Sequence, residues 1–275
     1  MKRDGVNNFM NLSLDFKNKL NLIKKSKKSQ VTLFIIIVII VVATAGVVFY
    51  FTNNNTNNSF SSDPAVQEKF DNLKNSILSC SDLATIESLN TIGIQGGYYD
   101  APEKSFNLEW AFIPYYYSEG VAIVPTSTKV EGELGKFVND NIKLCINDID
   151  KSEFNVNYNE PKTDVQITQS GVGFVINMPI SLSRNNRAVS IDLKDMPKSY
   201  DIPLMDILNL GKYIANEAVK DDKNVCLTCI AKEAEDRNLL VDFINLEEAG
   251  TLVVISENYT ASGPYSLEFL NKYKE

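Results

Sequence analysis

The residues of this 275-residue chain that could carry chemistry are its four cysteines. Cys226 and Cys229 form a Cys-Leu-Thr-Cys motif, whereas Cys80 and Cys145 stand alone. A Cys-x-x-Cys at a helix start can be a redox dithiol, because the helix dipole lowers the pKa of the first thiol. It can also be a local disulfide, or half of a four-cysteine zinc site completed by Cys80 and Cys145. We predict the local disulfide, because no strand clearly precedes the motif.

Other residue types offer little chemistry. The chain has no His, which excludes Ser-His-Asp and Cys-His nucleophiles and imidazole metal ligands. The carboxylates of Asp201, Asp206, Asp221 and Asp222 have no partner at catalytic spacing. The glycines around Val172 lack the later glycine of a dinucleotide loop. We therefore predict no catalytic residue, no metal site and no cofactor. Enzymatic activity stays an open question, and a binding or structural role is favoured.

Two amphipathic helices must position the isolated cysteines. Asp63 can cap the first helix, with Pro64 in its first turn. Apolar residues then recur at helical spacing, which places Cys80 on one stripe and Cys145 on the other. The stripes are Val66, Phe70, Leu73, Ile77, Cys80 and Ala84, and Leu134, Phe137, Val138, Ile142, Cys145 and Ile149. Because both cysteines should point inward, we predict a Cys80–Cys145 disulfide, the alternative being two free buried thiols.

An aromatic segment lies between these helices and is expected to form a short hairpin. Its aromatic residues could line a binding surface, since Tyr and Trp combine large contact area with a polar group. More often, such residues pack a sheet against helices. The residues in question are Tyr98, Tyr99, Trp110, Tyr115, Tyr116 and Tyr117.

From about residue 165 the apolar period changes to two, which predicts an antiparallel sheet followed by further helices. Strands are expected at 165–168, 172–182 and 188–193, helices at 201–220 and 225–235, and a last hairpin at 239–244 and 251–257. Helices and strands that do not alternate strictly indicate the α+β class. We assign residues 63–275 to this α+β domain, with a possible sub-boundary near 150–163.

The distribution of charge and hydropathy predicts a membrane anchor. Residues 1–28 carry eight basic and two acidic residues, a net charge of +6. Because the whole chain has a net charge of −8, the residues after position 28 carry a net charge of −14. Residues 31–51 contain no charged residue and would form a helix of about 31 Å, which matches a bilayer core of about 30 Å. Basic residues favour the cytoplasmic side. We therefore predict a cytoplasmic tail (1–30), a transmembrane helix (31–51) and an extracellular C-terminal domain.

An Asn-rich segment at 52–62 follows the apolar stretch and is expected to be a flexible linker. N-x-Ser/Thr acceptors for glycosylation begin at Asn54, Asn57 and Asn258. The partners predicted are membrane lipid through residues 31–51 and an unknown protein or envelope component. The acidic balance, with a pI near 4.8, argues against nucleic acid.

The sequence Lys28-Ser-Gln-Val-Thr-Leu-Phe resembles the processing region of archaeal class III (type IV pilin-like) signal peptides. The resemblance implies cleavage between Ser29 and Gln30. Residues 25–180 also resemble a group of uncharacterised single-pass membrane proteins of small-genome (DPANN-type) archaea. That resemblance rests on the order of the Cys80 helix, Ile94-Gln-Gly-Gly-Tyr, Ile113-Pro-Tyr-Tyr-Tyr and the Cys145 helix, and it implies no activity.

Three hypotheses follow from the sequence. The favoured one is a membrane-anchored cell-surface protein that acts as a binding or structural envelope module. The second is a pilin-like subunit processed at Ser29/Gln30. The third is an extracytoplasmic thiol-disulfide enzyme that uses Cys226 and Cys229.

Overall fold

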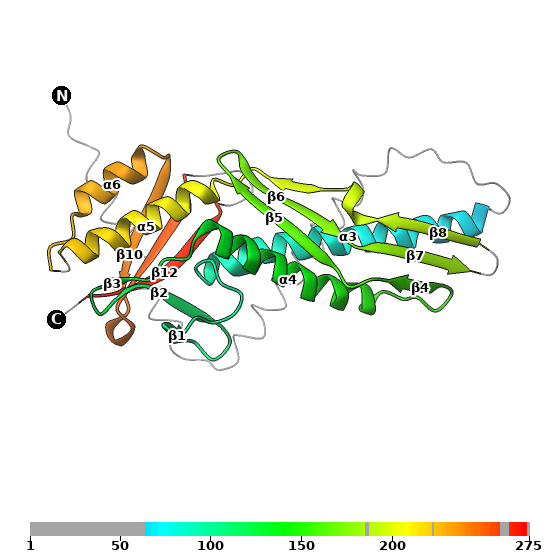
Figure 1. Cartoon of the computed structure of the whole chain (residues 1–275), viewed down its shortest axis with the longest axis horizontal. Helices are drawn as coiled ribbons and strands as arrows, with labels where there is room; N and C mark the ends of the chain where they lie inside the picture. Colours follow the sequence, from blue (N-terminus) through cyan, green and yellow to red (C-terminus); the bar gives the residue numbers. More distant parts are fainter. Residues whose placement is uncertain (1–63, 185–186, 222, 259–263, 274–275) are drawn as a thin grey trace, which may run out of the picture. The chain divides into compact units, whose positions relative to one another are not determined.

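The computed structural model describes residues 64–184, 187–221, 223–258 and 264–273. These belong to one compact unit, Asp63–Glu275, in which helices pack with three β-sheets (Figure 1). The α+β class is therefore confirmed for this part of the chain. The predicted tail, membrane helix and linker lie outside the described residues, as does the cap Asp63. Among the helices that are described, none is long and apolar enough to cross a bilayer.

Two long helices form one side of the core. Helix α3 (Pro64–Ile94) and helix α4 (Ser127–Asp148) pack against each other through the predicted apolar stripes. Helix α4 begins where the Thr126 hydroxyl accepts the backbone N–H of Lys129 at 3.1 Å. Cys80 and Cys145 form a disulfide between the two helices, with their Cα atoms 5.6 Å apart. The predicted pairing is confirmed.

A buried carboxylate fixes the chain where it leaves α3. Glu133 of α4 is 5% exposed and accepts the backbone N–H groups of Tyr99 at 2.8 Å and Asp100 at 3.0 Å. It also forms an ion pair with Lys129 at 2.6 Å. Burial alone would raise the pKa of Glu133, but these hydrogen bonds and the Lys129 charge outweigh it and lower that pKa.

The largest sheet is mixed rather than purely antiparallel. Its strand order is β1-β2-β12-β11-β10, with β3 paired to β2. All neighbours are antiparallel except β12 and β2, which are parallel. The bounds are β1 (Ser105–Asn107), β2 (Phe112–Ser118), β3 (Val121–Ala122), β10 (Leu239–Asn245), β11 (Thr251–Glu257) and β12 (Ser266–Lys272). The hairpin predicted at 239–244 and 251–257 is confirmed as β10 and β11, but no prediction covered β12, the central strand of this sheet.

Two three-stranded antiparallel sheets complete the β structure. Their orders are β4-β7-β8 and β5-β6-β9. The bounds are β4 (Asn155–Tyr158), β5 (Lys162–Thr168), β6 (Gly171–Asn177), β7 (Pro179–Arg184), β8 (Arg187–Asp192) and β9 (Lys198–Tyr200), with a 3₁₀ turn η1 (Leu193–Asp195). The strand predicted at 172–182 is in fact two strands in different sheets. The division falls at Met178, because Pro179 lacks an N–H for a continuous ladder and is suited to the first position of a strand.

Two helices flank the five-stranded path of the mixed sheet. Helix α5 (Leu204–Lys220) packs against β2, β3 and β11, and helix α6 (Leu227–Glu235) packs against β10 and α5. Gly211 of α5 allows a close approach, because a Cβ there would lie 3.1 Å from the Tyr116 ring. A second 3₁₀ turn, η2 (Glu247–Ala249), connects β10 to β11. Helix α6 therefore lies beside strand β10 (Figure 1).

Candidate binding site between α6 and β10

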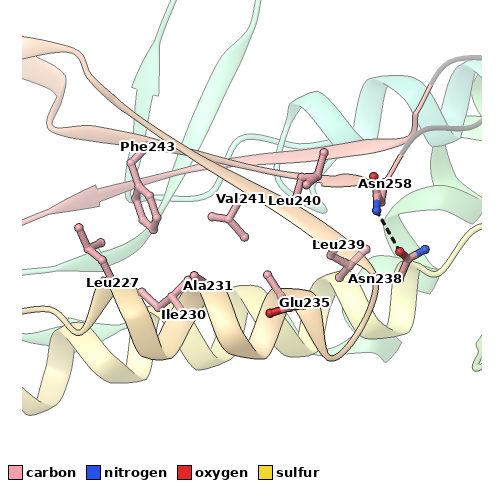
Figure 2. A pocket seen from close by; sticks show the side chains of 11 residues that line it. Leu227, Ile230, Ala231, Glu235, Asn238, Leu239, Leu240, Val241, Phe243 and Asn258 are labelled. Carbon is pink, nitrogen blue, oxygen red and sulfur yellow. Dashed lines mark hydrogen bonds between the residues drawn. The ribbon is translucent and has the colours of Figure 1, made fainter. Parts of the chain in front are cut away.

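An open, mostly apolar cleft lies between helix α6 and strand β10. Its volume is about 330 Å³, near the lower end of the range for ligand sites. Figure 2 shows side chains of the helix and of the strand facing each other across it. The lining residues, which define the α6/β10 cleft, are Leu227, Ile230, Ala231, Ala234, Glu235, Asn238, Leu239, Leu240, Val241, Phe243 and Asn258.

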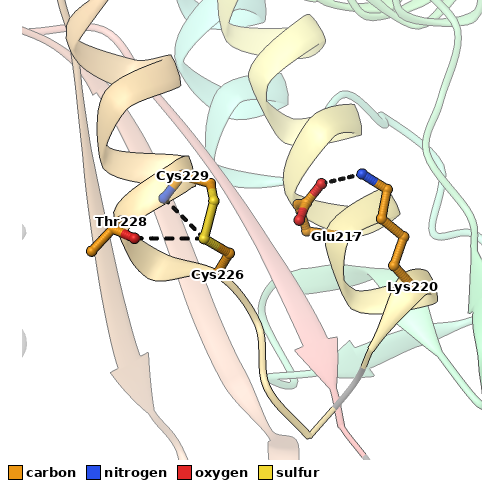
Figure 3. The surroundings of a disulfide bond; sticks show 5 residues. All are labelled: Glu217, Lys220, Cys226, Thr228 and Cys229. Atoms are coloured by element: carbon orange, nitrogen blue, oxygen red, sulfur yellow. Dashed lines mark hydrogen bonds and ion pairs between the residues drawn. A yellow bond between two sulfur atoms is a disulfide. The ribbon is translucent and has the colours of Figure 1, made fainter.

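The helix side of the α6/β10 cleft is held by a disulfide. Cys226 is the N-cap of α6, and its Sγ accepts the backbone N–H of Cys229 at 3.3 Å. The Cys226–Cys229 bond closes the first turn (Figure 3). Ile230 and Ala234 of the next turns are buried against the sheet. Leu227, between the two cysteines, is 58% exposed and is therefore presented at the mouth of the cleft.

Figure 3 also shows an ion pair on the neighbouring helix α5. Lys220 of α5 contacts the nearly buried carboxylate of Glu217 at 2.5 Å. The hydrogen bond and the charge of Glu217 raise the pKa of Lys220. Lys220 is thus already engaged by Glu217 and does not offer a free cation to the disulfide.

The strand side of the cleft is the edge of the mixed sheet. Within the described residues β10 pairs with β11 alone. The ladder runs without a bulge from Leu239 opposite Glu257 to Asn245 opposite Thr251. Two backbone hydrogen bonds just beyond the ends of the ladder show which residues of β10 bond to β11. Leu246 N–H donates to Gly250 O, and Asn258 N–H donates to Asn238 O. Even-numbered residues therefore make the ladder, and odd-numbered ones direct N–H and C=O to the open side.

The open side of β10 is therefore a row of available backbone groups. Leu239, Val241, Phe243 and Asn245 present their N–H and C=O groups there, and no hydrogen bond to the N–H of Val241 or Phe243 forms within the described part of the chain. Leu239 is buried, Val241 is half-buried and Phe243 is exposed. Solvent access to these backbone groups therefore increases along the strand from Leu239 to Phe243.

The surroundings of the cleft are acidic. Residues 227–258 contain seven Asp or Glu and two Lys or Arg, a net charge of −5. One of the two cations, Arg237, forms an ion pair with Glu233 at 2.5 Å. Glu235 lines the cleft, and Asp242 lies on β10, and both are exposed. Apolar walls and a negative rim suit binding of a ligand with apolar and cationic groups.

The structure bears on two of the cysteine hypotheses, the local disulfide and the zinc site. Cys226 and Cys229 form the predicted local disulfide. Because Cys80 is bonded to Cys145, the four sulfurs are in two separate disulfides and do not form the four-thiolate zinc site considered above. In the part of the chain that is described, no group of three or more His, Cys, Asp or Glu is placed to hold a metal ion.

The six aromatic residues do not form one surface. Tyr98, Tyr116 and Tyr117 are buried in the core, where Tyr116 stacks on Phe269 with the ring centroids 4.0 Å apart and donates its hydroxyl to Gly96 O at 3.0 Å. Burial raises the pKa of Tyr116 well above its ordinary value. These three tyrosines thus pack the mixed sheet against the helices, and the binding interpretation is wrong for them.

The other three aromatic residues are separate from one another. Tyr115 is half-buried and donates its hydroxyl to Ala249 O at 3.0 Å. Tyr99 is half-buried against Phe137. Trp110, in the β1–β2 loop, is 81% exposed. Of the predicted surface, therefore, Trp110 alone is an exposed aromatic side chain.

The remaining predicted site residues are placed as follows. Asn258 is exposed and lines the α6/β10 cleft. Ser29, Gln30, Asn54 and Asn57 lie outside the described residues. Their roles in processing and glycosylation stay predictions.

The residues that form the cleft were not predicted from the sequence, although one signal was present. Strand β10 is apolar on both faces, with Leu239, Val241 and Phe243 on one and Leu240 and Ile244 on the other. Such a run is typical of an interior strand.

In comparisons with known proteins, no family model, curated sequence or solved structure matches this chain.

Proposed function

We propose that the protein is a single-pass membrane protein of the cell surface whose extracytoplasmic domain binds a protein partner at the α6/β10 cleft. The observation that carries this proposal is the combination of an open sheet edge and an apolar cleft. Five of the thirteen large hydrophobic side chains exposed on the described residues lie between Leu227 and Leu246. Exposed apolar groups that cluster in this way are typical of interaction sites.

Membrane anchoring is supported by the sequence and by the disulfides. Residues 31–51 have the length and the charge-free character of a membrane helix, and the basic segment before them favours a cytoplasmic N-terminus. Disulfides persist in oxidising compartments and are rare in the cytosol. Two disulfides in residues 63–275 are therefore consistent with an extracellular domain.

Topology can be tested on intact cells. Protease added outside should digest the domain of the full chain, and a tag placed before residue 1 should be protected until the cells are lysed. A domain that survives on intact cells and is digested only after lysis would contradict the proposed orientation.

Partner binding at the cleft can be tested by photo-crosslinking in the native membrane. A photoreactive phenylalanine at Phe243, which lines the cleft, should give a discrete protein adduct on irradiation. The matched control is Leu144 on α4, an exposed leucine (61%) outside the cleft. Equal adducts at both positions, or none at Phe243, would count against the cleft as the binding site.

A second candidate function is thiol–disulfide exchange, which the geometry at Cys226 favours. In the reduced protein, the Cys229 N–H and the N-terminus of α6 would stabilise a Cys226 thiolate. Attack by a partner's dithiol would reduce the Cys226–Cys229 bond and oxidise the partner to a disulfide. The test is thiol titration after reduction. A Cys226 pKa near the ordinary value of about 8.5 would exclude this function.

A further inference from the structure

Strand β10 has the composition of a central strand but occupies an edge. Leu239, Leu240, Val241, Phe243 and Ile244 form two apolar faces within seven residues, interrupted by one charge. Natural proteins usually protect an exposed edge with charges, proline, a bulge or a covering element. The ladder of β10 has no bulge, and Asp242 is the single charged residue on the strand. The composition of β10 is therefore typical of a strand that pairs with a second strand at least part of the time.

The backbone of β10 is arranged to receive such a neighbour. Val241 and Phe243 direct N–H and C=O groups to the open side, two residues apart, as a further strand requires. An extended peptide that adds to an edge gains these main-chain hydrogen bonds, and side-chain pockets supply specificity. The α6/β10 cleft is such a pocket, because Leu227, Ile230 and Ala231 face the strand across it (Figure 2).

The charges around the edge indicate what the added strand carries. The net charge of −5 over residues 227–258 favours cationic side chains and repels anionic ones. Asp242 lies between Leu240 and Ile244 on the face opposite Val241 and Phe243. Glu247 and Glu248 follow beyond the end of the strand. A partner strand would thus have apolar residues towards the cleft and Lys or Arg towards Asp242.

A second copy of this chain fits the edge less well. Pairing of two β10 strands would bring two regions of charge −5 together and place the two Asp242 carboxylates on paired strands. Like charges on neighbouring strands are destabilising. The observations therefore favour a different partner with the opposite charge.

We propose that β10 binds, as an added strand, an extended segment of a protein partner in which apolar residues alternate with Lys or Arg. This inference rests on the proposed function and specifies the partner's chemistry. The segment pairs with the open side of β10 through Val241 and Phe243, its apolar side chains enter the α6/β10 cleft, and its cations lie near Asp242.

The experiment uses the full chain in detergent micelles or nanodiscs and synthetic heptapeptides as probes. The first probe is acetyl-Lys-Val-Lys-Val-Lys-Val-Lys-amide. The second replaces each Lys by Glu, which preserves length and apolar content. The third is the Lys peptide with N-methylated amides on alternate residues, which preserves charge but removes backbone donors. Affinity is measured by calorimetry at two salt concentrations, and backbone protection by amide hydrogen exchange.

We expect the Lys peptide to bind at least about tenfold more tightly than the Glu peptide, with a difference that shrinks at high salt. It should slow exchange at the Val241 and Phe243 amides. The Asp242 amide already bonds to β11, so its protection should change little and it serves as the internal reference. N-methylation should abolish the protection, and Asp242→Lys should reduce the preference for the Lys peptide.

Three outcomes would overturn the inference. A Lys peptide that binds without protecting Val241 and Phe243 would show that the cleft binds side chains but adds no strand. Equal or tighter binding of the Glu peptide would refute the charge complementarity. Failure of all peptides, with a concentration-dependent dimer abolished by Asp242→Lys or Val241→Pro, would assign the edge to a second copy. The photo-crosslink at Phe243 tests the proposed function separately, because it requires no particular peptide chemistry.

Discussion

Asn258 donates a side-chain hydrogen bond to Asn238, with 3.1 Å between Nδ2 and Oδ1, at one end of the α6/β10 cleft (Figure 2). The Asn258 backbone N–H also donates to Asn238 O. Asn258 begins an N-x-Thr acceptor, so the residue that would carry a glycan belongs to the lining of the proposed binding site. We therefore predict that glycosylation of Asn258 would interfere with binding in the cleft.

A glycan on Asn258 should weaken binding of the Lys peptide by at least about tenfold, because it would occupy the end of the cleft. The comparison is between the full chain made in a glycosylating host and its Thr260→Ala variant, which keeps Asn258 but lacks the acceptor. Thr56→Ala with Ser59→Ala is the matched control, since it removes the linker acceptors alone. Equal affinity of the glycosylated chain and Thr260→Ala would refute the coupling.

The buried carboxylate of Glu133 should be a major anchor of the loop after α3. Glu133→Gln removes the charge that the Tyr99 and Asp100 N–H groups and Lys129 contact, so we expect a loss of about 1–3 kcal/mol in the free energy of unfolding. Urea unfolding at pH 7 measures the loss. Glu68→Gln, at an exposed position of α3, is the control and should change stability by less than about 0.5 kcal/mol.

The same carboxylate predicts part of the acid sensitivity. The folded pKa of Glu133 lies below the ordinary value of 4.5. The ionised Glu133 therefore contributes its full stabilisation above pH 4.5. This stabilisation is lost as the pH falls through the lower folded pKa, because the carboxylate then becomes protonated in the folded state as well. Glu133→Gln should fall less steeply in stability from pH 5 to pH 3 than the unsubstituted chain. Parallel curves for the two proteins would contradict this assignment.

Local patterns predicted the elements of this fold that depend on neighbouring residues. The helical stripes through Phe70 and Ile142 placed Cys80 and Cys145 inward, and the structure joins them. The hairpin of β10 and β11 was also predicted, because both strands are apolar and a Gly at position 250 lies in the connection between them.

The missing parts depend on contacts between residues far apart in the chain. Strand β12 lies between β11 and β2, yet its alternation fails where Leu270 and the buried Asn271 follow each other at a register shift. No pattern within β10 shows that it is an edge rather than an interior strand. Likewise, Trp110 and Tyr116 differ in exposure because of their places on a loop and in a sheet, not because of their residue types.

The two disulfides should differ in their contributions to stability. Cys80 and Cys145 are separated by 65 positions, and Cys226 and Cys229 by 3. In the chain-entropy model the first bond contributes about 4 kcal/mol and the second about 2 kcal/mol, because a longer loop loses more entropy when it is closed. Urea unfolding of the two double Cys→Ala variants measures the difference. Equal losses, or a larger loss for the local pair, would show that strain or packing dominates over loop entropy.

Trp110 offers a direct optical test of the exposed loop, because it is the single tryptophan of the chain. The backbone positions it, since Leu108 N–H donates to Ala111 O at 2.8 Å and Glu109 N–H donates to Asn107 Oδ1 at 2.8 Å. Acrylamide should quench its fluorescence in the folded chain nearly as efficiently as in the urea-unfolded chain.

Substitution of Trp110 should separate exposure from packing. Because 81% of the side chain is exposed, Trp110→Phe should change the free energy of unfolding by less than about 0.5 kcal/mol. Tyr116→Phe provides the contrast, since it leaves the buried Gly96 carbonyl without its donor and should cost about 1–3 kcal/mol. Strong protection of Trp110 from quenching, together with a large loss on Trp110→Phe, would mean that another surface covers this loop in the full chain.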